Sequence, residues 1–338
     1  MSKGIRISID DIKQYKILRK EDVNQADPEN LNASWKYAPI IVTSNRERVD
    51  ISTAKARLYA QDSSTYVFRW ANEIKEWRNR PALTSERLQV HQDEPAFWQT
   101  FVAGADAYLT SNINNAVGLA NGTSVKLHSL TFSDEMQLDA VLHELQNKPA
   151  GSTITLPEPP MAVNVEIDMP INESNSAKIQ VLKQHSIDND KIVIPILSAK
   201  SSTKAHNYTI VQPHSGIARV TTQELFPFDL SFAITVFKAQ GKTMPKVVLA
   251  LAHRYAQSIQ FSYSAIYVAL SRVKRASDIR LLLHDNGSRP GFSGLQYISH
   301  LKHDIHVLDY YKGYTLPVHG QLWNAQKTLS FKKQRPQK

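Results

Sequence analysis

The sequence predicts an α/β fold in which a parallel sheet flanked by helices is interrupted by a smaller, β-rich insert. Short apolar, β-branched runs typical of buried parallel strands occur toward both ends of the chain, and polar loops or helical patterns follow them. Between them, short alternating runs with turn signals take over. We therefore divide the chain into a first α/β part at 1–96, an insert at 97–225, the remainder of the α/β domain at 226–315 and a basic tail at 316–338.

The first α/β part is expected to contain a strand, a loop and a helix. The run APIIVT at 38–43 has the composition of a fully buried strand. A polar turn at 44–46 leads into a helix whose apolar positions recur at helical spacing and which ends near Gln61; these positions are Val49, Ala54, Leu58 and Tyr59.

The insert is expected to contain short strands, one hairpin and one helix. Alternating residues predict strands around Val125, Leu127 and Leu130, and around Val163, Val165, Ile167 and Met169. Asn121-Gly122 suggests the first hairpin, because this dipeptide readily supplies positive φ angles. A helix is expected to start at Ser133, with an apolar stripe formed by Leu138, Val141, Leu142 and Leu145. The polar stretch at 172–178 is interpreted as a loop or linker.

The α/β pattern resumes after the insert. Buried strands are expected at 233–237, 247–251 and 279–283, with a helix at 263–274 between the last two. In that helix Tyr263, Ile266, Leu270 and Val273 mark the inward face. A final helix is expected at 295–310.

Composition excludes several classes of function. The chain has no cysteine, which rules out disulfides, thiolate nucleophiles and Cys-based metal sites. No apolar run is long enough to span a bilayer and no secretory signal is recognisable, so an intracellular protein without a membrane partner is expected. The 40 Lys and Arg residues exceed the 31 Asp and Glu residues, which favours a polyanionic partner. Part of this excess lies in the tail, which is expected to be solvated.

The segment from Thr235 to Thr243, with the sequence TVFKAQGKT, is the most informative one for chemistry. It follows a predicted buried strand, and ligands of open α/β sheets bind at the carboxyl ends of the strands. Gly241 allows close approach of the backbone to a phosphate, while Thr235, Lys238 and Thr243 offer hydroxyl and ammonium donors. The alternative is an exposed basic loop that joins two strands.

The triplet Gly241-Lys242-Thr243 is similar to the end of a phosphate-binding Walker loop. Such a loop also requires a glycine five residues before Gly241, and Val236 occupies that position. No apolar strand ending in Asp-Glu, which could hold magnesium, is present either. The sequence as given therefore predicts no P-loop.

The second informative segment is YVALSR at 267–272, in which Arg272 leaves the apolar face of the predicted helix. A guanidinium at this place could stabilise charge on a transferring phosphoryl group. A single arginine is more often a surface salt-bridge residue. The functional interpretation therefore depends on the pairing of this segment with the 235–243 loop.

These strings resemble the motifs of one helicase family. TVFKAQGKTMPKVVLAL at 235–251 is similar to motif V of superfamily-one DNA helicases of the Pif-one/RecD-like type, and YVALSRVKR at 267–275 to their motif VI. APIIVTSNRERVDIS at 38–52 resembles the segment with motif IV, and GADAYLTSNINNAVGLANGTSVKL at 104–127 the hairpin that opens the family's β-barrel insert. The resemblance runs from about residue 36 to 285. Within the family, the amino-acid sequence resembles most the helicases of Helitron-type mobile elements.

The resemblance implies roles for individual residues. Arg272 would contact the γ-phosphate as the catalytic arginine finger, and Gln240 and Gly241 would couple nucleotide to DNA. Motif IV implies Asn45 as a DNA contact and Arg48 as a nucleotide contact, while Thr235, Lys238 and Thr243 would lie beside the single strand. The family usually has histidine at the position of Phe237, which puts one DNA or coupling contact in doubt.

The resemblance also implies a fold and an activity. The fold would be the second RecA-like domain, interrupted by a small β-barrel of the Src-homology type. The chain would be the C-terminal portion of an ATP-dependent DNA helicase that moves 5′ to 3′ and binds single-stranded DNA, located in the nucleus if the organism is eukaryotic. ATP with Mg²⁺ would bind only together with a first RecA-like domain, supplied by a missing N-terminal part or by a separate chain. By itself, the chain is expected to be inactive as an ATPase.

Two alternatives remain open at the level of sequence. One is a non-catalytic nucleic-acid-binding remnant of a mobile-element helicase, and the other is an interaction scaffold unrelated to nucleic acid. A metal site formed by His300, His303, Asp304 and His306 is rejected, because this spacing spreads the side chains around a helix.

Overall fold

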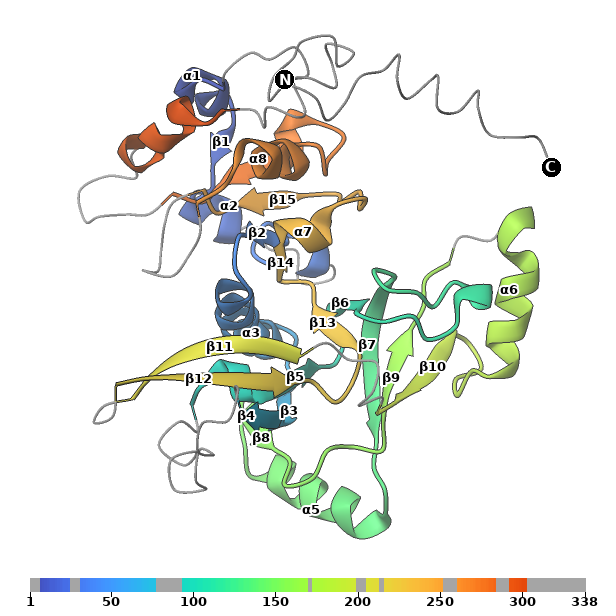
Figure 1. The fold of residues 1–338 in the computed structure, drawn as a ribbon. Helices are drawn as coiled ribbons and strands as arrows, with labels where there is room; N and C mark the ends of the chain where they lie inside the picture. The colour runs from blue at the N-terminus through green and yellow to red at the C-terminus, as the bar shows by residue number, and fades with distance from the viewer. Residues whose placement is uncertain are drawn as a thin grey trace, which may run out of the picture.

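The computed structural model describes residues 7–24, 31–76, 93–169, 172–198, 205–212, 216–251, 260–283 and 292–302. Figure 1 shows a parallel sheet with its helices in the upper half of the molecule and three further sheets in the lower half. The tail at 316–338 lies outside the described residues.

The upper sheet is entirely parallel. Its strands follow the order β1 (Lys16–Ile17), β16 (Ile279–Leu281), β15 (Val247–Leu249), β2 (Ile40–Val42) and β14 (Ala233–Thr235). The four buried strands predicted from sequence are all confirmed and all belong to this sheet. The edge strand β1 was not predicted. It has only two residues, of which the first is exposed and the second half-buried, and these form no apolar run.

Alternate strand residues supply the two faces of this sheet. Ile41 and Leu249 face the side covered by α1 (Ile9–Lys13), α7 (Val236–Ala239), α8 (Tyr263–Leu270) and η5 (Phe292–His300). Ile40 and Val248 face the side on which Trp35 and Ile51 lie. Both faces are therefore covered, as expected for a parallel sheet.

The helix α3 (Asn45–Asp62) connects the sheet to the rest of the molecule. Its N-cap Ser44 accepts a hydrogen bond from the Glu47 amide at 3.2 Å, and the helix contacts β2 and β14 on one side. It also contacts β3 (Val67–Ala71), η2 (Pro95–Phe97) and β5 (Trp98–Val102). The helix predicted after residue 46 is thus confirmed.

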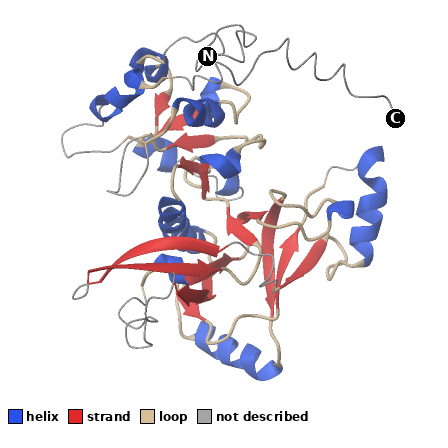
Figure 2. Ribbon diagram, in the orientation of Figure 1, coloured by secondary structure: helices blue, strands red, loops and turns tan. Residues whose placement is uncertain are grey.

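The remaining strands form three sheets, coloured red in the lower half of Figure 2. The largest has the order β10 (Val193–Leu197), β9 (Ala162–Glu166), β7 (Ser124–Thr131), β6 (Asp106–Leu109) and β13 (Phe228–Leu230). The second has the order β11 (Ala205–Gln212), β12 (Gly216–Gln223) and β4 (Glu73–Glu76), and the third the order β5, β3 and β8 (Thr153–Thr155). Strands β3 and β4, which precede residue 97, pair with strands that follow it, and the domain boundaries stay a prediction.

The hairpin suggested by Asn121-Gly122 joins β6 to β7. These strands are antiparallel, and Gly122 has a φ of +93° in a turn that the Thr123 amide closes on the Ala120 carbonyl at 3.0 Å. A positive φ at the third position of a turn favours glycine. The connection also contains η3 (Asn115–Val117) and is longer than a two-residue hairpin loop.

Several predicted helix boundaries need correction. The interpretation of 172–178 as a loop is wrong, because α6 (Glu173–Gln184) starts there with Asn172 as its N-cap, and its buried residues Ile179 and Leu182 come after the polar stretch. In α5 (Glu135–Gln146) the N-cap is Asp134, one residue after the predicted start. The predicted strand at 233–237 ends at Thr235, so that Phe237 belongs to α7.

The C-terminal part has shorter helices than predicted. Helix α8 ends at Leu270, and the segment predicted as a helix from 295 is a 3-10 helix, η5, which ends at His300. Two further short helices are α2 (Lys20–Asn24) and η1 (Leu31–Ala33), and η4 (Ala276–Asp278) precedes β16. No helix in the described ranges combines the length and apolar character needed to cross a membrane.

Candidate functional site

The loop at 235–243 starts where two parallel strands end side by side. Thr235 pairs with Val42 in the register of β14 and β2, so α7 and the N-terminus of α3 begin at the same edge of the sheet. The carboxyl ends of strands are the ligand-binding edge of open α/β sheets. The 235–243 loop therefore lies at the carboxyl ends of β14 and β2, and its role as a binding site stays a prediction.

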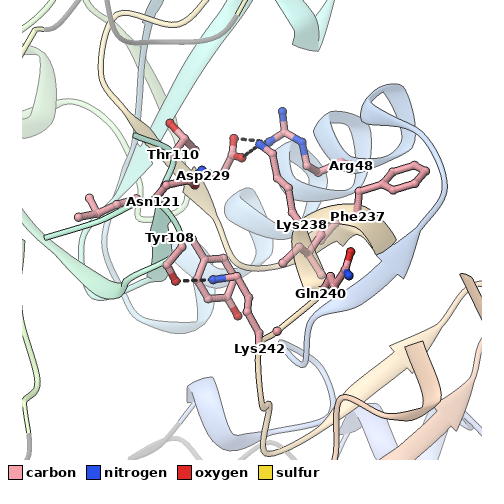
Figure 3. Close-up of a pocket in the computed structure, with 14 residues that line it drawn as sticks. Arg48, Tyr108, Thr110, Asn121, Asp229, Phe237, Lys238, Gln240 and Lys242 are labelled. Atoms are coloured by element: carbon pink, nitrogen blue, oxygen red, sulfur yellow. Dashed lines mark hydrogen bonds and ion pairs between the residues drawn. The ribbon is translucent and has the colours of Figure 1, made fainter. Parts of the chain in front are cut away.

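A cavity of about 510 Å³ lies between this loop and the hairpin of the insert. Figure 3 shows Tyr108, Thr110 and Asn121 of the insert on one side of it and Phe237, Lys238 and Gln240 on the other. Arg48, Lys242 and Asp229 complete the charged lining. Three cations and one carboxylate thus line the cavity, which favours an anionic ligand.

Asp229 is the centre of a buried ionic cluster at one end of this cavity. Its Oδ1 pairs with Arg48 and its Oδ2 with Lys238, and only 5% of its side chain is exposed. Burial opposes ionisation, but Arg48 and then Lys238 outweigh it and hold the pKa of Asp229 below its ordinary value. Asp229 therefore stays charged and fixes the direction of the Lys238 side chain.

Glu224 is the second carboxyl of this cluster. Its Oε1 lies 3.8 Å from Arg48 Nη2, too far for a hydrogen bond, and Arg48 Nη2 has no hydrogen-bond partner. Burial, followed by the charge of Asp229, raises the pKa of Glu224 to about 8. The surroundings thus favour the ionised form of Asp229 and the protonated form of Glu224.

Lys242 connects the loop to the insert. Its Nζ donates a hydrogen bond to the Gly122 carbonyl and lies 4.1 Å from the centroid of the Tyr108 ring. Burial, followed by the charge of Lys238, lowers the pKa of Lys242. The hairpin turn and the 235–243 loop are therefore held together by one side chain.

Arg272 lies against the backbone of the same loop but does not line the cavity. Its guanidinium donates to carbonyl oxygens of Val268 at 2.8 Å, Lys242 at 3.3 Å and Ala239 at 3.5 Å. The Met244 amide donates in turn to the Arg272 carbonyl at 2.8 Å. No carboxylate within the described ranges pairs with Arg272. The surface salt bridge considered as the alternative is thus not formed in this part of the chain.

The structure brings some of the predicted site residues together and separates others. Arg48, Lys238, Gln240 and Gly241 line the 510 Å³ cavity, and Gly241 has a φ of +81°. Thr243 lines a second cavity of about 350 Å³ instead, together with Tyr108 and Asp106. Thr235 is buried at the end of β14, and Asn45 Nδ2 lies 3.3 Å from His206 Nδ1. The functional roles of these residues stay predictions.

Three charged residues of the site were missed in the sequence. Asp229 and Glu224 had a detectable signal, because each is an acid beside the apolar run that leads into a buried strand, and such an acid needs a partner. Lys242 was noted only as part of the triplet with Gly241. Its contact with Gly122, 120 positions earlier, has no local sequence signal.

The described residues contain no group of three or more His, Asp or Glu side chains that could hold a metal ion. Of the histidine cluster considered in the sequence, His303, Asp304 and His306 lie outside the described residues. Asp229, the carboxylate in the lining of the larger cavity, is already shared between Arg48 and Lys238.

Comparisons with known proteins give one sequence match and several structural ones. No protein-family model matches the chain. Over 88 residues, or 25% of its length, it is 40% identical to the ATP-dependent DNA helicase PIF5 of Trypanosoma brucei brucei, and the match covers 9% of that protein.

The solved structures include the Pif1 helicase from Candida albicans, with 17% identity and a TM-score of 0.40 over 88% of this chain and 53% of that one. Bacteroides Pif1 bound to ssDNA matches with 13% identity and a TM-score of 0.45 over 91% of this chain and 50% of that one. The chain thus spans about half the length of these helicases.

Proposed function

We propose that this chain, a Pif1 helicase homologue by sequence over 88 residues, forms the C-terminal portion of an ATP-dependent DNA helicase. In this proposal the parallel sheet is the second RecA-like domain and the lower sheets include the β-barrel of the Src-homology type. The observation that carries the proposal is the cavity at the carboxyl end of β14, which is lined by cations of the 235–243 loop and closed by the insert hairpin. A single DNA strand is its proposed ligand.

The proposed roles of Lys238, Gln240 and Gly241 follow their positions in the cavity lining. Those of Thr243, Thr235 and Asn45 follow the family resemblance, since Thr243 lines the second cavity and Thr235 is buried. Lys238 and Thr243 contact the strand, and Gln240 and Gly241 couple it to the nucleotide. Thr235 and Asn45 complete the strand contacts at the sheet edge. Arg48 is 3% exposed and paired with Asp229, which favours a role in positioning Lys238 over the nucleotide contact implied by the family resemblance.

Arg272 is proposed as the arginine finger of an ATPase site between two domains. Its guanidinium contacts only neutral oxygens of the backbone and of Ser271, and so carries a charge that no carboxylate of the described residues offsets. A guanidinium in such a place stabilises the charge that develops on a transferring phosphoryl group. Mg²⁺ does not fit the larger cavity of this chain, because the Asp229 carboxylate in its lining is already paired with Arg48 and Lys238. The ligands of the Mg²⁺ ion are therefore assigned to a first RecA-like domain.

The test uses the 338-residue chain, a first RecA-like domain polypeptide of a Pif1-type helicase, and single-stranded DNA. The chain alone is expected to bind the strand with an affinity that falls steeply with salt, and to show no ATP turnover. Adding the first domain should give DNA-stimulated turnover, which Arg272→Ala should lower about 10³-fold or more. Arg275→Ala, at an exposed arginine three positions further on, is the matched control and should leave turnover unchanged.

Two outcomes would contradict the proposal. DNA-stimulated ATP turnover by the chain alone, abolished by Arg272→Ala, would show that no second domain is needed. Strand binding without any turnover after addition of the first domain would favour the non-catalytic remnant. The hydrogen bonds that already occupy the Arg272 guanidinium are the observation in favour of that second candidate.

A further inference from the structure

Phe237 is an aromatic side chain exposed at the edge of the larger cavity. It is 79% exposed, whereas Val236 and Ala239 in the same short helix are 4% and 0% exposed. These two buried neighbours fix α7 against the sheet and against α8, and therefore turn Phe237 outward. Figure 3 shows its ring on the side opposite Thr110 and Asn121, directed away from the other labelled residues.

The ring contributes nothing visible to the stability of the fold. Transfer of a phenyl group out of water is favourable, and an exposed ring does not have this stabilisation. A flat apolar surface that covers the ring would provide it. An aromatic ring at the mouth of a cavity therefore needs a ligand with a flat face. Phe237 lines the cavity in spite of its exposure, so a ligand in the cavity can reach it.

The charges beside the ring narrow the class of ligand. Lys238 follows Phe237 directly, 32% of its side chain is exposed, and Arg48 and Lys242 lie in the same lining. A ligand with anionic groups and flat faces satisfies both the cations and the ring. Single-stranded nucleic acid has this chemistry, since its bases are free to stack on aromatic side chains while its phosphates face a cationic groove. The bases of a duplex are already stacked on each other.

We propose that Phe237 stacks on a base of a DNA single strand whose adjoining phosphates face Lys238. The inference rests on the proposed function and adds to it the residue that contacts a base. It assigns to the loop a contact that is tolerant of sequence, because every base offers a π face.

The experiment measures binding of the full chain to a labelled oligothymidylate and to the same oligonucleotide without bases. Phe237→Leu keeps an apolar side chain and removes the π face, whereas Phe237→Trp keeps it. We expect Phe237→Leu to weaken binding of the oligothymidylate about 5- to 150-fold, and Phe237→Trp to bind like the natural chain. Tyr267→Leu, which changes an aromatic residue of α8 that is 52% exposed and not part of the cavity lining, is the matched control.

The oligonucleotide without bases separates stacking from other effects. It should bind the natural chain and Phe237→Leu equally, because the stacking partner is gone from both. In Phe237→Trp, the fluorescence of the new indole should be quenched by the oligothymidylate and not by the baseless strand. Thermal unfolding of each variant, expected to be unchanged at so exposed a position, excludes loss of the fold.

The outcomes distinguish this inference from the proposed function. If the natural chain and Phe237→Leu bind the oligothymidylate with equal affinity, stacking at Phe237 is refuted while strand binding stands. If Phe237→Leu weakens both oligonucleotides to the same extent, the ring does not contact a base. If the natural chain binds neither strand at low salt, the proposed function fails, and the inference fails with it.

Discussion

At the scale of single residues, Asp229 decides how the charges of the candidate site are arranged. Each of its oxygens pairs with a different cation, Arg48 from α3 and Lys238 from α7. A buried charge is tolerated only when it is paired, so the carboxylate and Arg48 depend on each other. Lys238 is partly exposed to solvent, and its ion pair with Asp229 fixes the direction of its side chain. A phosphate can therefore bind to an ammonium group whose position is already fixed.

Glu224 gives this cluster a dependence on pH. Its pKa is raised from 4.5 to about 8, so between these values the folded chain holds a proton that the unfolded chain has lost. The free energy of unfolding should then fall as pH rises from about 5 to 8, with a slope on the order of 1 kcal/mol per pH unit at most. Urea unfolding at several pH values measures this slope.

The variant Glu224→Gln isolates the effect, because it keeps the shape of the side chain and removes the titration. Its unfolding free energy should change less over this range than that of the natural chain, and the difference between the two should grow toward pH 8. Asp229 does not interfere, since its lowered pKa affects stability only as pH falls below about 4. Parallel stability curves for the two chains would exclude a titrating Glu224.

At the scale of elements, Lys242 is the contact that joins the 235–243 loop to the hairpin of β6 and β7. We expect Lys242→Met to lower the free energy of unfolding by about 1–2 kcal/mol, because it removes a charged hydrogen bond and a cation–π contact in a partly exposed place. Amide hydrogen exchange should become faster at Gly122, whose N–H donates to the Leu109 carbonyl at 2.7 Å.

The matched control for this contact is Lys246→Met. Lys246 belongs to the same connection between α7 and β15, but its ammonium lies 5.3 Å from the Trp35 ring. Its removal should leave exchange at Gly122 unchanged. Equal acceleration in both variants would mean that general loss of stability, and not the contact with the hairpin, opens the turn.

Some helices and strands could be predicted from the sequence, and others could not. The four predicted strands of the parallel sheet were found because buried strands are continuous apolar runs. Helix α3 was found because apolar residues recur at roughly helical spacing, although Ala54 and Leu58 of the predicted stripe are exposed and only Tyr59 is buried. Helix α6 was missed because its first residues are polar and its buried residues come last. The ion pairs of Asp229 could not be predicted, since they join β13 to residues of α3 and α7 that only the folded chain brings together.

At the scale of the whole molecule, the two halves meet at the candidate site. Strand β13 of the largest lower sheet runs almost directly into β14 of the parallel sheet, and the cavity takes its lining from both sides of that passage. The placement of the 235–243 loop after a buried strand was predicted from the sequence. The contribution of Tyr108 and Asn121 was not, because it depends on how the insert folds back on the loop.

The order of strands in the parallel sheet also has a kinetic consequence. Strands β2 and β14 are neighbours although residues 43–232 separate them, whereas β6 pairs with β7 and β11 with β12 across short connections. Contacts between distant segments form slowly, because the loop must first close. During refolding, pulsed hydrogen exchange should therefore show protection of β6 and β7 before that of β2. The loop that carries Lys238 would then be the last part of the site to take its place, and simultaneous protection of both regions would contradict this order.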